Sequence, residues 1–182
     1  MTETRWLTAA EQGQWRALVR GSSRLLEQLD RDLRAEHGLT LDEYGVLVQL
    51  SEGAAEGLRM SVLATHTLMS KSRLTYTVDR MERAGWLERS SCPEDGRGLR
   101  AALTEKGWAL IHTAAHTHVQ GVRRWLVDVV TPEEFEAIGS ALDRVRERIE
   151  SQPRGEGCTG DGGTEIGCPG STDAPDATAA PD

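Results

Sequence analysis

The chain has 182 residues, and its 21 Lys and Arg against 29 Asp and Glu give a formal net charge of −8 at pH 7. This length suits one domain of ordinary size with an appendage, and three cysteines are too few for a disulfide framework. No run of eighteen apolar residues predicts a membrane span, and the N-terminus lacks the basic and then apolar pattern of a secretion signal, so we expect a cytoplasmic protein.

Charge is distributed unevenly along the chain. Residues 154–182 contain one Arg, six acidic residues and seven of the nineteen glycines. Such a segment buries too little apolar surface to offset its ordering entropy, so we predict a disordered acidic tail over 152–182. Residues 59–100, in contrast, hold eight Lys or Arg against five Asp or Glu. A local basic patch permits nucleic-acid binding even when the whole chain is acidic.

Threonine and glutamate three residues apart indicate three helix starts, because the threonine oxygen can cap a backbone N–H while the glutamate reaches back. The pairs are Thr8 with Glu11, Thr40 with Glu43, and Thr131 with Glu134. The first pair precedes a predicted amphipathic helix over about 9–36, and the second precedes one over about 42–50. Ser61 is expected to cap a short helix that ends near Leu68.

Ser70 begins a further predicted helix with two unlike faces. Leu74, Val78 and Met81 fall on one stripe and should be buried. The other face carries hydroxyl, aromatic and basic side chains, namely Ser72, Arg73, Tyr76, Arg80 and Arg83. Gly85 closes this helix.

Two short alternating runs, WLERSSC and LRAALT, flank the glycine-rich stretch PEDGRG and predict a β-hairpin. Two long helices follow, from Glu105 to about Val130 and from Pro132 to about Ser151. The last helix has an apolar face made by Phe135, Ile138, Leu142, Val145 and Ile149. A small central domain could hardly cover this face and the leucine stripe of the first helix, so we expect a homodimer.

A helix, a turn, a second helix and a hairpin form the layout of a winged helix-turn-helix, whose second helix fits the major groove of DNA. The stretch from Met69 to Gly107 resembles the recognition helix and wing of the MarR family of transcriptional regulators. The matching wing signature is Asp95-x-Arg97, then Leu103-Thr104, then Gly107. The resemblance covers about Glu11 to Ser151.

The resemblance implies a mostly α-helical fold with a small β-hairpin wing. It places dimerisation helices at 8–37 and 105–151 around a winged helix-turn-helix lobe at 38–104. The implied function is a homodimeric regulator, expected to repress, that binds a pseudo-palindromic double-stranded DNA operator and can be released by a small-molecule ligand. A winged-helix module for protein association without operator binding is the alternative, although it would not require the basic and hydroxyl face of the Ser70 helix.

We expect DNA contacts from ten residues: Ser70, Lys71, Ser72, Arg73, Thr75, Tyr76, Arg80, Asp95, Arg97 and Arg100. The alternative for the helix residues is a solvated surface. Arg97, flanked by glycines at the predicted tip of the turn, suits the negative potential of a narrow minor groove. By resemblance, Asp95 would hold this tip.

Trp15, Tyr44, Trp108 and His112 are candidates to line the ligand cavity that the family often has between its dimer helices and its DNA-binding lobe, with plain core as the alternative. His112 and His116 have the i, i+4 spacing that can bind a metal, and His118 lies nearby, but no complementary ligand accompanies them. We therefore expect interface histidines, no metal and no cofactor.

We expect no catalytic activity, because the chain has no phosphate-binding glycine loop and no nucleophile elbow. Cys92 near the wing is expected to be a bystander thiol. Cys158 and Cys168 lie in the predicted tail.

Overall fold

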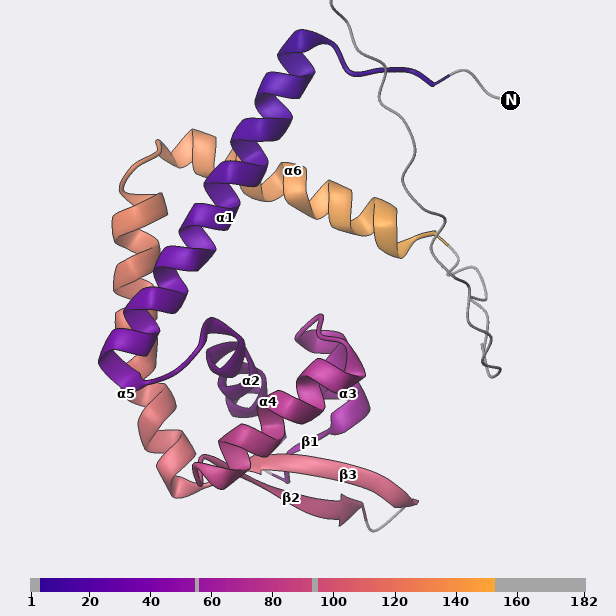
Figure 1. Ribbon diagram of the computed structural model, residues 1–182, viewed down its shortest axis with the longest axis vertical. Helices are drawn as coiled ribbons and strands as arrows, with labels where there is room; N and C mark the ends of the chain where they lie inside the picture. Colours follow the sequence, from indigo (N-terminus) through magenta and orange to yellow (C-terminus); the bar gives the residue numbers. More distant parts are fainter. Residues whose placement is uncertain (1–3, 55, 93–94, 153–182) are drawn as a thin grey trace, which may run out of the picture. The chain divides into compact units, whose positions relative to one another are not determined.

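The computed structural model describes residues 4–54, 56–92 and 95–152, without the side chains of residues 92 and 95–97 (Figure 1). The chain divides into two units, Met1–Gly139 and Ser140–Asp182, and the first contains the elements up to the first part of α6. The predicted tail, with Cys158 and Cys168, lies outside the described residues.

Helices dominate the described chain. In order they are α1 (Ala9–His37), α2 (Leu41–Glu52), α3 (Met60–His66), α4 (Lys71–Arg83), α5 (Glu105–Val122), the π-helical turn η1 (Arg123–Val127) and α6 (Pro132–Glu150). The strands are β1 (Leu58–Arg59), β2 (Leu87–Cys92) and β3 (Asp95–Leu103), and they form an antiparallel sheet in the order β1-β3-β2. The predicted fold class, mostly α with a small β-hairpin wing, is confirmed.

The three predicted helix starts are confirmed by their hydrogen bonds. Thr8 and Thr40 each form a complete capping box with the glutamate three residues later. Ahead of α6, the Thr131 N–H donates to Glu134 Oε2 at 2.8 Å, and the Glu134 N–H donates to Thr131 Oγ1 at 3.2 Å. Each pair satisfies backbone N–H groups that a helix leaves without an internal partner.

The start of α3 differs from the prediction. The residue before the helix is Arg59, which caps it without a side-chain hydrogen bond, so the expected cap at Ser61 is wrong. The cause is strand β1, which pairs with β3 through Leu58 and Ala101 and leads directly into the helix. A strand of two residues has no periodicity that sequence analysis could detect.

The end of α5 also differs. The predicted single helix from Glu105 to about Val130 contains the π-helical turn η1 after Val122. Within this turn the indole N–H of Trp125 donates to Asp32 Oδ2 of α1 at 3.2 Å. One turn earlier, Gly121 packs so closely on α1 that an added Cβ would lie 2.8 Å from Leu29 Cδ2.

The core lies where α1 and α5 meet the winged lobe. Leu33 of α1, Leu47 of α2, Leu63 of α3 and Ala114 of α5 are fully buried together with the inner face of α4. α1 and α5 run side by side, and α4 lies between α2, α3 and the sheet (Figure 1).

Apolar side chains outside this core remain uncovered in the single chain. On α1 they are Trp15, Leu18, Val19 and Leu26, and on α6 they are Phe135, Ile138, Leu142, Val145 and Ile149. These are the two faces from which the sequence predicts a dimer. None of the helices described in residues 4–152 is long and apolar enough to cross a membrane.

Candidate nucleic-acid interface

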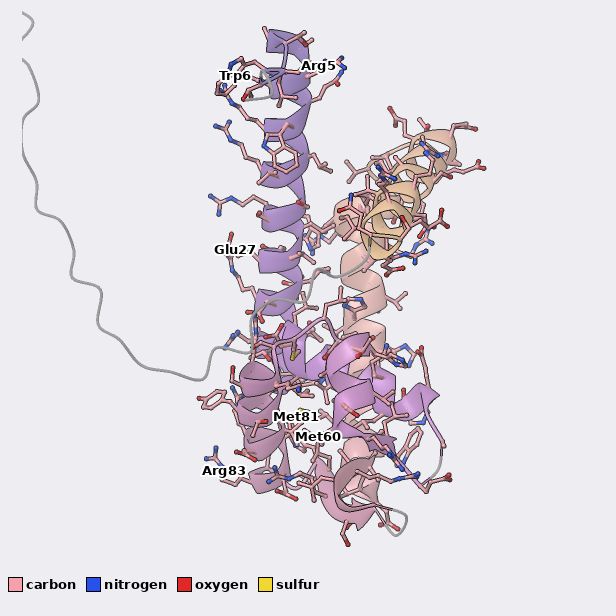
Figure 2. All side chains as sticks on the ribbon, turned by 90° about the vertical axis from the view of Figure 1, so that its right-hand side faces the viewer. Arg5, Trp6, Glu27, Met60, Met81 and Arg83 are labelled. Carbon is pink, nitrogen blue, oxygen red and sulfur yellow. The ribbon has the colours of Figure 1, made fainter. Side chains whose placement is uncertain are left out.

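Helix α4 separates an apolar face from a polar one, as its sequence predicts. Leu74, Val78 and Met81 are at most 1 % exposed and pack in the core, and each such burial contributes about 1.5–3 kcal/mol to folding. Figure 2 shows Met81 directed into the lobe and Arg83 directed away from it. Ser70 Oγ caps the helix by accepting from the Arg73 N–H at 3.3 Å.

The outward face of α4 presents the predicted contact residues. Ser70, Lys71, Ser72, Arg73, Thr75 and Tyr76 are all exposed. Tyr76 is 69 % exposed, so most of its ring is accessible to a partner. α4 begins at Lys71, and the start of a helix favours an anion such as phosphate through its backbone N–H groups and the helix dipole.

Two arginines of α4 already bind carboxylates of α2. Arg73 Nε donates to Asp42 Oδ2 at 2.9 Å in an exposed pair. Arg80 Nε lies 3.0 Å from Oε1 of Glu43, which is only 2 % exposed. A phosphate near Arg73 therefore competes with Asp42, whereas Arg80 is committed to a buried acid.

Arg100 lies in the sheet rather than on α4. Its Nη1 is 3.7 Å from Glu56 Oε1, and its buried Nε has no hydrogen-bond partner among the described residues. A buried donor without a partner is costly to folding.

The wing is the hairpin of β2 and β3. Ser91 pairs with Leu99, and the next residue of β2, Cys92, pairs with Asp95. Residues 96–98 of β3 therefore have no counterpart on β2 and form a bulge. Arg97 is the central residue of this bulge, within β3, whereas the sequence predicted the tip of the turn. The side chains of Asp95, Arg97 and Cys92 lie outside the described part of the chain.

Arg89 of β2 holds the wing against α4. Its Nη1 lies 2.7 Å from Asp79 Oδ1, and its backbone N–H donates to Glu82 Oε1 at 3.0 Å. The hydrogen bond from the Arg89 side chain lowers the pKa of Glu82, and the same bond raises the pKa of Arg89. The helix and the hairpin are thus joined by charge-assisted hydrogen bonds as well as by the shared core.

A pocket of about 330 Å³ lies between α2, the end of α3 and α5. Its lining residues are Leu41, Asp42, Tyr44, Gly45, Val48, Gln49, His66, Thr67, Met69 and His118. Of the four predicted ligand-binding residues only Tyr44 lines it. Trp15, Trp108 and His112 lie elsewhere and are exposed.

Sequence analysis missed His118 as a pocket residue. Its ring stacks on Tyr44 with centroids 4.5 Å apart, and burial lowers its pKa while burial raises that of Tyr44. The sequence held one indication of this difference. His118 lies six residues after His112, which places the two side chains on different faces of α5. His112 and His116 are exposed, and no group of three or more metal-ligating side chains occurs among the described residues.

Comparison with known proteins shows clear similarity. A family model described as the MarR family matches residues 37–98. The transcriptional regulator PecS of Dickeya dadantii is 31% identical over 134 residues, which cover 70% of this chain and 78% of PecS.

Two solved structures from Streptomyces coelicolor are also similar. AbsC, a MarR family transcriptional regulator, is 42% identical with a TM-score of 0.77, covering 82% of this chain and 100% of that one. Sco3205, a MarR family regulator solved in complex with DNA, is 39% identical with a TM-score of 0.79, covering 84% and 94%.

Proposed function

The chain belongs to the MarR family of transcriptional regulators, and from this premise we propose that it is a cytoplasmic homodimer that binds a pseudo-palindromic DNA operator, represses transcription there and has no catalytic activity. Two copies of α4 enter successive major grooves, with half-sites about 10 bp apart or slightly more. A dimer that covers its operator hinders other proteins at that site, which is why we propose repression.

The observation that carries this proposal is the outward face of α4. It combines a helix N-terminus, hydroxyls and an exposed tyrosine on an element that the core and the wing hold firmly. Sco3205, which shares this fold at 39% identity, has been crystallised with DNA. An association module would need no such face.

We propose that Arg97, in the bulge at 96–98, reaches into the minor groove beside each half-site. Asp95, at the start of β3, would hold the bulge, and Arg100 would contact phosphate. On α4 we propose base and phosphate contacts for the exposed residues from Ser70 to Tyr76.

We further propose that a small molecule in the pocket lined by Tyr44 and His118 relieves repression. A ligand can act only through unequal affinity for two conformations, so it must prefer a dimer whose recognition helices are wrongly spaced for the operator. Asp42 lines this pocket and also binds Arg73 of α4, which gives the ligand a direct route to the recognition helix.

Selection of bound sequences from random duplexes tests the proposed function. We expect enrichment of a two-fold symmetric motif whose half-sites are about one helical turn apart. Failure of the full-length protein to enrich any duplex at low ionic strength would contradict DNA binding and would favour the association module.

A further inference from the structure

Glu43 is a buried carboxylate with bonds in two directions. Its Oε2 accepts from the Thr40 N–H at 2.8 Å within the capping box of α2. Its Oε1 lies 3.0 Å from Arg80 Nε on α4. The same side chain therefore fixes the start of α2 and binds the recognition helix.

Arg80 continues this connection to α1. Its Nη2 donates to the carbonyl oxygen of Gly38 at 3.3 Å. Gly38 is the left-handed residue that ends α1, with φ of 68°. Arg80 thus contacts both sides of the junction between α1 and α2, and we call the set Glu43, Arg80 and Gly38 the Arg80 bridge.

The bridge is difficult to break or to rearrange. A carboxylate that is 2 % exposed cannot exchange its cation for water, and removal of one partner of such a pair leaves an uncompensated charge. The planar guanidinium reaches an acid and a carbonyl at once, which a lysine ammonium cannot do in the same geometry. The pair of Arg73 with Asp42 on the same two helices is exposed and has neither property.

The Arg80 bridge lies between the proposed dimer helix α1 and the proposed DNA-binding helix α4. The exposed apolar face of α1 is one of the two faces proposed to form the dimer, and α4 is proposed to enter the DNA. A rigid connection between the end of α1 and α4 would transmit the dimer geometry to the recognition helix. Core contacts alone permit small sliding movements of packed helices.

We propose that Arg80 is a positioning residue, which fixes α4 to the α1–α2 junction and so sets the spacing between the two recognition helices of the dimer. This inference rests on the proposed function. It differs from the DNA contact predicted for Arg80 from the sequence, because the charge of Arg80 is used within the chain.

The test uses the full-length Glu43→Gln/Arg80→Gln double variant. Arg80→Gln alone leaves a buried carboxylate without its cation and can prevent folding, whereas the double variant removes both charges together. Arg24→Gln is the matched control, because it loses one exposed arginine that pairs with Glu27 on α1, away from the bridge.

The first measurement is binding to the selected operator and to an operator whose half-sites are one base pair further apart. We expect the preference of the double variant for the correct spacing to fall about fivefold or more, the low end of typical coupling between sites. The dependence of log affinity on log salt should keep its wild-type slope, and Arg24→Gln should keep both values. An unchanged spacing preference overturns the inference, and so does a salt slope smaller by about one contact, because it identifies Arg80 as a phosphate contact.

The second measurement is amide hydrogen exchange without DNA. We expect faster exchange in α4 and at residues 38–43 of the double variant, with α5 unchanged, since general destabilisation would affect all helices. If amide exchange in α4 is equally fast in the double variant and in the wild type, the inference is overturned. Failure of the wild-type protein to bind any duplex would contradict the proposed function, and hydrogen exchange would still decide the role of Arg80.

Discussion

Arginines in the described part of the winged lobe bind carboxylates of their own chain. The pairs are Arg73 with Asp42, Arg80 with Glu43, Arg89 with Asp79 and Glu82, and Arg100 with Glu56. A phosphate that contacts one of these arginines must share it with a carboxylate or replace the carboxylate. The electrostatic gain per contact is then smaller than for an unpaired cation, so the total number of arginines in the lobe overstates the attraction for DNA.

Arg97→Ala is expected to weaken operator binding and to reduce the slope of log affinity against log salt by about 0.9, the value of one phosphate contact on duplex DNA. The reason is the contact that we propose for Arg97, at the centre of the bulge of β3, with the minor groove. Titrations at several salt concentrations check this, with Arg24→Ala as the control. A slope equal to that of the wild type would contradict a role for Arg97 in the groove.

His118→Asn is expected to make folding less sensitive to acid. Burial lowers the pKa of His118 in the folded state, so the unfolded chain takes up a proton first. The folded state is therefore penalised increasingly as the pH falls below about 6.5, the ordinary histidine value.

The measurement is urea unfolding of the wild type and of His118→Asn between pH 5 and pH 8. The difference in unfolding free energy between the two proteins should shift in favour of the variant as the pH falls. A difference that does not change with pH would refute this.

At the scale of elements, close packing explains why residue 107, which follows the wing, is a glycine. A Cβ added at Gly107, in the first turn of α5, would lie 1.9 Å from the carbonyl oxygen of Trp86. A backbone atom cannot move aside at low cost. Gly107→Ala should therefore lower the free energy of unfolding by about 1–3 kcal/mol or more, the usual cost of overpacking.

Gly45→Ala in α2 is the matched control, because nothing lies within 4 Å of its added Cβ. It should stabilise the protein by about 0.5–1 kcal/mol through the higher helix propensity of alanine. Chemical denaturation of the two variants compares them. Equal stability of Gly107→Ala and the wild type would show that α5 does not pack on Trp86 in this way.

Elements that depend on local interactions could be predicted from the sequence. The capping boxes at Thr8 and Thr40, the buried stripe of α4 and the hairpin are all encoded within a few neighbouring residues. Strand β1 and the turn η1 could not, because each exists through contacts with distant segments, namely Ala101 of β3 and Asp32 of α1.

In the candidate site, too, the features set by neighbouring residues could be predicted and those set by distant contacts could not. The exposed face of α4 was visible in the sequence as a helical pattern. The ion pairs of Arg73 and Arg80 were not visible, because Asp42 and Glu43 lie outside the basic segment 59–100 and reach it only in the fold. The pocket was predicted from aromatic residues, and of these the fold brings Tyr44 alone to it.

At the scale of the whole molecule, the uncovered apolar faces of α1 and α6 lead to the expectation of a dimer. Leu26 is 52 % exposed in the single chain, and Leu26→Asp would place a charge within the proposed interface. We expect this variant to be monomeric by light scattering at concentrations where the wild type is dimeric. A persistent dimer would show that this face of α1 is not the interface.

Truncation after Gln152 tests the other end of the chain. The tail carries a net charge of −5 and a single large apolar side chain, so we expect it to add nothing to dimerisation. The truncated protein should have the dimeric mass of the full chain. A monomer would refute the proposed boundary at residue 152.

The central claim is that two copies of α4, presented by one dimer, bind one symmetric duplex. The most direct measurement is titration of the full-length protein, at low ionic strength, against the selected operator and against the same duplex with one half-site scrambled. We predict two copies of the chain per intact operator and markedly weaker binding to the scrambled duplex. Equal affinity for the two duplexes, or one copy per operator, would contradict the account.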